Sequence, residues 1–288
     1  MSKTIKKTPE VFIGITTWNS ELFLPFCLES IKKTLPEAEV VILDNVSIDE
    51  TQAIAKKFNT RLIVKRCGQA EALNMLASSS RSPYTVLIHA DVVFLSNQWA
   101  SRCISKLTDE IVLVSPEDIG CGPYTRPWGK NKPESSFMFF KTECFKNISI
   151  SRRYQRFKIP YYKRVIDFYG DHITYNIPES LESSSLSWHP MKVHVSDYID
   201  HPYYIPPFEP RHWRDDLAHL RYGLGNFYSL DGEIMHYHNW YDRVPKIIDI
   251  SSTETADKNG NGVPSTYVSL YTKRFLEDYH NNAIVYPQ

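Results

Sequence analysis

A polar triplet, His89-Ala90-Asp91, directly follows an apolar segment at residues 84–88. The segment has the length and composition of a buried strand. In an α/β sheet, ligands bind at the carboxyl ends of the strands. A carboxylate placed there, one residue away from a second polar ligand, can hold a divalent cation, and the cation can hold a pyrophosphate. A single Asp at a strand end is common, so this interpretation depends on the residues that precede the triplet.

The elements that would position the triplet form a repeating pattern of strands and helices. Short apolar segments rich in β-branched residues lie at residues 11–15, 40–43, 61–64 and 85–88, and a further one lies at residues 137–140. Apolar residues at helical spacing separate the first four, and Ser47 and Glu50 have the spacing of a capping box, which predicts a helix that begins at Ser47. Apolar strands that alternate with helices are typical of a doubly wound, mostly parallel α/β sheet with helices on both faces.

Polar residues gather where each of the first four predicted strands ends. The clusters are Thr16-Thr17-Trp18-Asn19, Asp44-Asn45-Val46-Ser47, Cys67-Gly68-Gln69 and His89-Ala90-Asp91. Because the carboxyl ends of parallel strands meet at one edge of a sheet, we expect these clusters to converge on a ligand site. The alternative is that residues such as Asp44 and Ser47 only shape a turn and cap a helix.

The order of these clusters resembles the nucleotide-sugar-binding half of family-two glycosyltransferases. The most specific part is the run Asp44-Asn45-Val46-Ser47-Ile48-Asp49-Glu50-Thr51. The resemblance covers residues 10–115 well and residues 135–201 loosely. It implies the GT-A fold, with a doubly wound, mixed but mostly parallel sheet. It also implies a nucleotide diphosphate sugar as donor, Mn²⁺ or Mg²⁺ as cofactor, and transfer of a hexose or pentose with inversion at the anomeric carbon.

The resemblance assigns the nucleobase to the first two clusters. Thr16 and Trp18 would border the base, together with their neighbours Thr17 and Asn19. Asp44 would hydrogen-bond the base, which favours a uridine diphosphate donor.

The same resemblance assigns supporting and phosphate-binding roles to the remaining positions. Asn45 and Ser47 would support the Asp44 loop, Gly68 would let the backbone approach the donor, and Asn74 would lie beside it. Asp91 matches the second acidic residue of the family's Asp-x-Asp motif. The first acidic position is His89, which brings no negative charge at neutral pH and leaves the identity of the metal open.

Asp171 is the predicted general base. Residues 167–176 resemble the family segment in which an acidic residue opens a helix under the acceptor. Inverting transfer needs a carboxylate near the acceptor hydroxyl, on the face opposite the leaving nucleotide. At a helix N-terminus, free backbone amides would position the carboxylate and keep it ionised. Asp167 is the alternative base, and a simple N-cap is the alternative role for Asp171.

A distal histidine is expected to complete the metal site with Asp91. His201 fits the family spacing best. His236 and His238 are its rivals, because two histidines one residue apart point the same way if their segment is a strand. Either of them could instead contact the acceptor or pack beneath aromatic side chains.

Composition predicts a soluble, cytoplasmic enzyme. The chain has 288 residues, a formal net charge of zero and 42% hydrophobic residues. It contains no apolar run of the length that a bilayer requires, so no transmembrane segment is expected. Five scattered cysteines are typical of reduced thiols. A neutral chain is not expected to bind nucleic acid tightly in general.

Three parts are expected along the chain. Residues 1–9 form a flexible tail, and residues 10–201 form a GT-A-like domain with a nucleotide-sugar half (10–115) and an acceptor half (116–201). Residues 202–288 form an aromatic-rich C-terminal extension packed on the acceptor side of the same domain.

The sequence thus predicts metal-assisted transfer of a sugar to a hydroxyl acceptor, with a glycan favoured and a modified nucleobase or another polymer left open. A nucleotidyltransferase on a related fold is one alternative, but Thr16-Thr17-Trp18-Asn19 lacks the Gly-rich, basic loop that such enzymes usually carry. A non-catalytic nucleotide-sugar-binding module is the other. His89 favours this module, whereas Asp91 and Asp171 oppose it.

Overall fold

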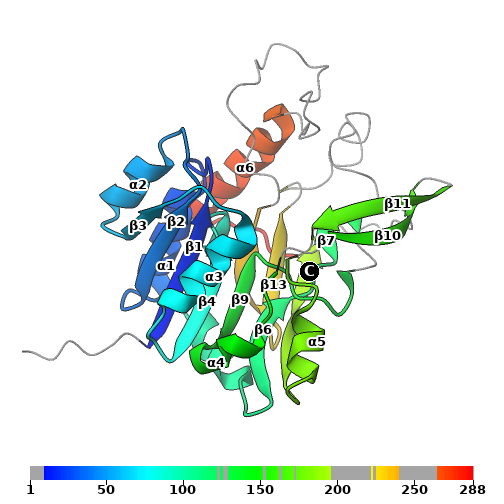
Figure 1. The fold of residues 1–288 in the computed structure, drawn as a ribbon. Coiled ribbons are helices and arrows are strands. Elements are labelled where there is room, and N and C mark those ends of the chain that lie inside the picture. Colours follow the sequence, from blue (N-terminus) through cyan, green and yellow to red (C-terminus); the bar gives the residue numbers. More distant parts are fainter. Residues whose placement is uncertain are drawn as a thin grey trace, which may run out of the picture.

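A ten-stranded mixed sheet forms the centre of the molecule (Figure 1). The computed structural model describes residues 10–121, 124–125, 129–151, 154–161, 164–171, 173–195, 222, 225–239 and 265–287. The strand order is β3-β2-β1-β4-β9-β6-β12-β13-β14-β5. The predicted tail at residues 1–9 lies outside the described residues, and the division into three parts stays a prediction.

The first half of the sheet is parallel, as the sequence predicts. Its strands are β1 (Val11–Thr17), β2 (Glu39–Asp44), β3 (Arg61–Val64) and β4 (Tyr84–His89), paired in one direction. The connecting helices are α1 (Leu24–Thr34), α2 (Thr51–Lys57) and α3 (Gln69–Ser79). The polar clusters that follow these strands therefore do lie along one edge of the sheet.

The second half of the sheet is mixed. Its strands are β5 (Val92–Phe94), β6 (Ile111–Pro116), β9 (Phe137–Lys141), β12 (Ser187–Val195), β13 (Asn226–Leu230) and β14 (Glu233–His238). The strand β9 runs antiparallel to both β4 and β6, whereas β6 and β12 are parallel. The remaining pairs, from β12 through β13 and β14 to β5, are antiparallel.

The other elements lie outside this sheet. There are three further helices, α4 (Trp99–Lys106), α5 (Ile177–Glu182) and α6 (Ser265–His280), and a 3₁₀ helix, η2 (Thr142–Asn147). There are also two small hairpins: β7 (Gly120–Cys121) pairs with β8 (Tyr124–Thr125), and β10 (Tyr154–Tyr161) pairs with β11 (Arg164–Asp171). Within the described ranges, the helices are too short or too polar to span a bilayer.

Helices cover both faces of the sheet, because alternate residues of each strand face opposite sides. In β9, Phe137 and Phe139 belong to a core shared with α1, α2 and α4, whereas Met138 and Phe140 belong to a core shared with α3 and α5. This two-faced burial confirms the predicted α/β fold class and explains why the strands are apolar on both sides.

The hairpin of β13 and β14 extends the sheet with residues from the C-terminal part of the chain. Its turn consists of Asp231 and Gly232, both with positive φ, as a two-residue type I′ turn requires. The next strand in the sheet, β5, begins directly after Asp91 and pairs with β14. Phe275 of α6 stacks on Tyr237 of β14, with ring centroids 3.7 Å apart. The fold therefore brings the end of β14 next to the triplet at residues 89–91.

Candidate functional site

Asp44 is fully buried at the end of β2, and protein donors surround its carboxylate. Oδ1 accepts hydrogen bonds from Thr17 Oγ1 at 2.9 Å and from Ser47 Oγ. Oδ2 accepts from the Ser47 backbone N–H and from Gln52 Nε2, both at 2.9 Å. A carboxylate offers about four acceptor positions, so the protein itself fills them. Asp44 thus supports the loop, and direct contact with a nucleobase would require one of these donors to move.

The same network explains why the predicted helix does not begin at Ser47. The side chain of Ser47 bonds to Asp44 instead of capping a helix, and α2 begins at Thr51. Val46 has a φ of 56°, in the left-handed region that helices do not use. The prediction of a capping box at Ser47 and Glu50 is therefore wrong.

The loop after β1 is tied to the loop after β2. The Asn19 backbone N–H donates to Ser47 Oγ at 2.8 Å, and Asn19 Oδ1 accepts from the Ile48 backbone N–H at 3.0 Å. Trp18 is 38% exposed beside this junction, so its ring is available for stacking on an aromatic ligand. Thr16 is buried, and its Oγ1 has no hydrogen-bond partner within the described residues.

The loop after β3 completes this edge. Asn45 Oδ1 accepts from the Cys67 backbone N–H at 3.1 Å, which ties the loop after β3 to the loop after β2. Gly68 precedes α3, and a Cβ built at Gly68 would meet no heavy atom within 4 Å, so open space lies in front of it. Asn74 has a partner of its own, because its Nδ2 donates to the Ile150 carbonyl at 2.8 Å.

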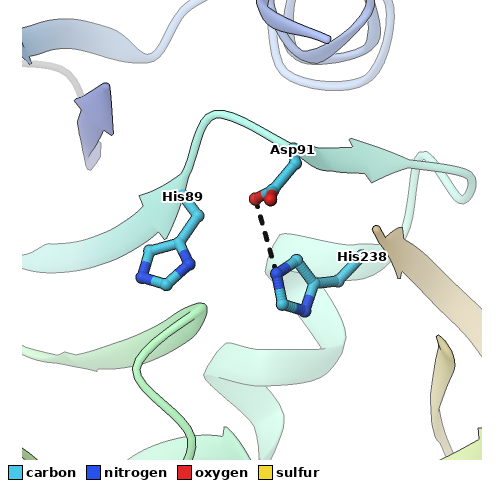
Figure 2. Close-up of side chains that lie close together, drawn as sticks. All are labelled: His89, Asp91 and His238. Atoms are coloured by element: carbon cyan, nitrogen blue, oxygen red, sulfur yellow. Dashed lines mark ion pairs between the residues drawn. The ribbon is translucent and has the colours of Figure 1, made fainter. Parts of the chain in front are cut away.

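His89, Asp91 and His238 form a compact cluster at the carboxyl end of β4 (Figure 2). One potential ligand atom from each residue lies within 4.8 Å of the other two. His238 Nε2 is 3.4 Å from Asp91 Oδ1, and both side chains are buried. His89 ends β4, Asp91 lies in the turn before β5, and His238 ends β14, which pairs with β5. Ala90 packs into the core between the first two.

Each imidazole of the cluster also contacts a polar side chain outside the cluster. Glu134 Oε1 is 3.1 Å from His238 Nδ1, and Glu134 is itself buried. Gln69 lies at the start of α3, and its Nε2 atom is 2.5 Å from His89 Nε2. The other ring nitrogen of His89 faces His238 (Figure 2). These contacts fix the orientation of the two rings.

Charge in the cluster is balanced around His238. Burial alone would lower the pKa of His238, but the facing carboxylates of Asp91 and Glu134 more than offset this effect and raise the pKa to about 10. This higher pKa favours the protonated ring of His238 when no ion is bound. A metal ion at this position would replace the proton on Nε2.

The geometry and chemistry of the cluster fit a divalent metal ion. Protein-bound ions lie roughly 2.0–2.6 Å from their ligand atoms, so the ligands of one ion lie within about 5 Å of one another. Two imidazole nitrogens and one carboxylate oxygen suit Mn²⁺ and other transition metals better than Mg²⁺, which prefers oxygen ligands. The donor set thus fits a divalent transition-metal ion.

The other predicted residues are placed differently. His236 stands apart from the cluster, because its ring is stacked between Phe137 and Tyr228 at centroid distances of 4.5 and 4.7 Å. Burial, followed by the nearby charge of His238, lowers its pKa well below the usual range.

His201 lies outside the described residues. Asp171 ends β11, and the next helix, α5, begins only at Ile177. The expectation that an acidic residue opens a helix there is wrong, and the role of Asp171 as base stays a prediction.

Sequence reasoning missed Glu134 and left His238 as one of two rivals. Asp231-Gly232, between two apolar segments, is a strong hairpin signal and could have established that His238 ends a strand. The sequence offers no comparable signal for Glu134, because that residue meets His238 through long-range pairing of strands.

Three solved structures resemble part of this chain. The chain resembles a mannosyltransferase from Pyrobaculum calidifontis in complex with GDP-Man and Mn²⁺, at 18% identity over 49% of this chain and 47% of that chain, with a TM-score of 0.39. It also resembles S. aureus TarS, at 16% identity over 50% of each chain and a TM-score of 0.38. A third is glucosyl-3-phosphoglycerate synthase from Mycobacterium tuberculosis with Mn²⁺, UDP and phosphoglyceric acid, at 15% identity over 50% of this chain and 58% of that chain, with a TM-score of 0.39.

These likenesses are too distant to argue for any residue or ligand, and the chain spans only about half the length of those structures. No curated protein matches the chain. The model of glycosyl transferase family 2, however, matches residues 12–169, which is more than half of the chain. That span contains all four polar clusters and the paired strands that position them. The resemblance drawn from the sequence is thereby confirmed, and the chain belongs to glycosyl transferase family 2.

Proposed function

We propose that this protein transfers a sugar from a nucleotide diphosphate donor to a hydroxyl acceptor, with Mn²⁺ held by His89, Asp91 and His238. The observation that carries the proposal is the compact His-Asp-His cluster at the carboxyl edge of the sheet, in a chain that belongs to a glycosyltransferase family. In this proposal His238 is the distal ligand, in preference to His201 and His236.

The nucleotide would lie along the loops that follow β1, β2 and β3. Trp18 offers an exposed ring for the base, and the open space at Gly68 leaves room for the backbone to approach the phosphates. Asp44 would hold the loop in shape through its bonds to Thr17 and Ser47. Uridine diphosphate is the proposed leaving group, on the strength of the family resemblance, and contact of Asp44 with the base would require one of its present donors to move.

When bound, the cation would neutralise the charge that develops on the departing diphosphate. His89, Asp91 and His238 would orient it, because each side chain comes from an element fixed in the sheet. Asp171 would take the proton from the acceptor hydroxyl, with Asp167 as the alternative base, and attack from the face opposite the nucleotide would invert the anomeric carbon. A glycan is the proposed acceptor.

A nucleotide-release assay tests the proposal. Purified protein is incubated with UDP-sugars and GDP-sugars, with and without Mn²⁺, and the free nucleoside diphosphate is measured. We expect Mn²⁺-dependent release from one donor class and its loss in Asp91→Asn. Donor binding without any release, indifferent to Mn²⁺, would instead support the non-catalytic binding module.

A further inference from the structure

We propose that Glu134 is a positioning residue that holds His238 with its Nε2 atom directed at the metal site. This inference rests on the proposed function, because it concerns the ligand that completes the His89–Asp91–His238 cluster. His238 has a carboxylate at each ring nitrogen: Asp91 Oδ1 lies 3.4 Å from Nε2, and Glu134 Oε1 lies 3.1 Å from Nδ1. The two carboxylates define opposite ends of one imidazole.

Glu134 is itself held firmly in place. Its Oε2 accepts a hydrogen bond from Tyr228 Oη at 3.0 Å, and its Oε1 also accepts from Ser136 Oγ. Its backbone N–H donates to the Pro116 carbonyl at 2.8 Å, and its carbonyl accepts from Ser115 Oγ at 3.1 Å. The side chain and the backbone are thus both anchored, to β6, to β13 and to the start of β9, so the carboxylate has a defined orientation.

A carboxylate in this position determines which nitrogen of the ring can bind an ion. A neutral imidazole has one N–H and one lone pair. When Nδ1–H donates to Glu134, the lone pair is on Nε2, which faces Asp91. Histidines that bind metals commonly donate their other N–H to a carboxylate or carbonyl, which fixes the tautomer and raises the basicity of the ligand.

The same strand supplies an internal comparison. His236 lies two residues before His238 on the same face of β14, and it is also buried. Neither of its ring nitrogens has a hydrogen-bond partner within the described residues, and two aromatic rings enclose it. The strand thus carries one histidine that is packed as an aromatic ring and one that is oriented by a carboxylate, and only the second faces Asp91.

The test is the affinity of the full chain for Mn²⁺, measured by titration and the electron paramagnetic resonance signal of the free ion. The variants are Glu134→Ala and Glu134→Gln. Glu117→Gln is the matched control in the neighbouring loop, where the Glu117 side chain accepts a hydrogen bond from the Asn131 backbone N–H at 2.8 Å. We expect roughly 10–100-fold weaker binding in Glu134→Ala. The Mn²⁺ affinity of Glu134→Gln should lie between those of Glu134→Ala and the wild type, because the amide oxygen can still accept a hydrogen bond from His238 Nδ1–H. Glu117→Gln should bind Mn²⁺ like the wild type.

A second readout separates positioning from folding. Circular dichroism reports the folded fraction, and the visible spectrum of bound Co²⁺ reports the ligand field. Positioning predicts an altered Co²⁺ spectrum in folded Glu134→Gln. Equal Mn²⁺ affinity and an unchanged Co²⁺ spectrum in that variant would overturn the role of Glu134, whereas a wild-type protein that binds neither ion would overturn the metal site itself.

Discussion

At the scale of single residues, the site separates groups that build it from groups left free to bind. The carboxylate oxygens of Asp44 accept hydrogen bonds from Thr17, Ser47 and Gln52. The Trp18 side chain, in contrast, is exposed, and no heavy atom fills the space beside Gly68. A residue type that fits ligand binding by sequence can therefore serve the scaffold. Stability measurements distinguish the two roles.

Asp44→Asn should destabilise the protein even without nucleotide. The amide replaces one acceptor oxygen with a donor, so buried donors lose their partner, at a cost of about 1–3 kcal/mol. The free energy of unfolding in urea measures this loss. A variant as stable as the wild type that binds nucleotide poorly would show that Asp44 contacts the base and does not support the loop.

His236→Phe should stabilise the protein and leave Mn²⁺ affinity unchanged. The ring already stacks between Phe137 and Tyr228, and its two nitrogens are buried without hydrogen bonds. Removing such unsatisfied groups is expected to gain about 1–3 kcal/mol. Urea unfolding and Mn²⁺ titration measure the two effects, and His194→Phe, which loses the bond to Ser229, should show no such gain. Weaker Mn²⁺ binding in His236→Phe would restore His236 as a ligand.

At the scale of elements, the hairpin of β13 and β14 delivers His238 to the triplet. Besides its pairing with β5, it is fastened to α4 by ion pairs from Arg102 to Glu233 and from Lys106 to Asp231. These pairs lie at the turn, at the far end of β14 from His238. The turn, together with the register shift between Tyr228 and Ser229, therefore sets the register that places His238 beside Asp91.

Gly232→Val should destabilise the hairpin and weaken Mn²⁺ binding. Gly232 has a φ of 80°, where a β-branched residue is strained, and the left-handed conformation costs roughly 1–2 kcal/mol for ordinary residues. Gly232→Asn is the matched control, because Asn tolerates this conformation. Urea unfolding and Mn²⁺ titration on both variants measure the effect, and equal behaviour of the two would show that the turn does not set the register.

The elements also show how far the sequence could be interpreted. The strands at residues 11–17, 39–44, 61–64 and 84–89 were predictable because apolar runs between helical patterns leave few alternatives. The start of α2 was not, because Ser47 has the spacing of a capping box, yet its side chain donates to Asp44 and accepts from the Asn19 backbone N–H of another loop. The segment at Asp171 resembled a helix start, yet it pairs as a strand with Tyr154.

At the scale of the whole molecule, the proposed metal ligands come from two parts of the chain that lie far apart in the sequence. His89 and Asp91 come from the predicted nucleotide-sugar half, whereas His238 comes from the C-terminal part, which joins the same sheet. The sequence predicted one distal histidine but could not choose among three, because the choice depends on which late strand lies beside β5. The structure places His238 there, next to Val92 in the register.

Asp171→Asn should leave donor binding intact and slow sugar transfer by roughly 10²–10⁴-fold, as expected for loss of a general base. Calorimetry with the donor and a transfer assay with the accepted sugar measure the two quantities separately. Asp167→Asn is the matched comparison. A near-normal rate in Asp171→Asn with a slow rate in Asp167→Asn would assign the base to Asp167.

The most direct measurement is calorimetric titration of UDP into the wild-type protein, with and without Mn²⁺, alongside His238→Ala and the control His194→Ala. We predict that Mn²⁺ strengthens UDP binding by about tenfold or more, equivalent to about 1.4 kcal/mol, in the wild type and in His194→Ala. His238→Ala should lose this effect. The same UDP affinity with and without Mn²⁺ in the wild type, or a full Mn²⁺ effect in His238→Ala, would contradict the assignment of the metal site.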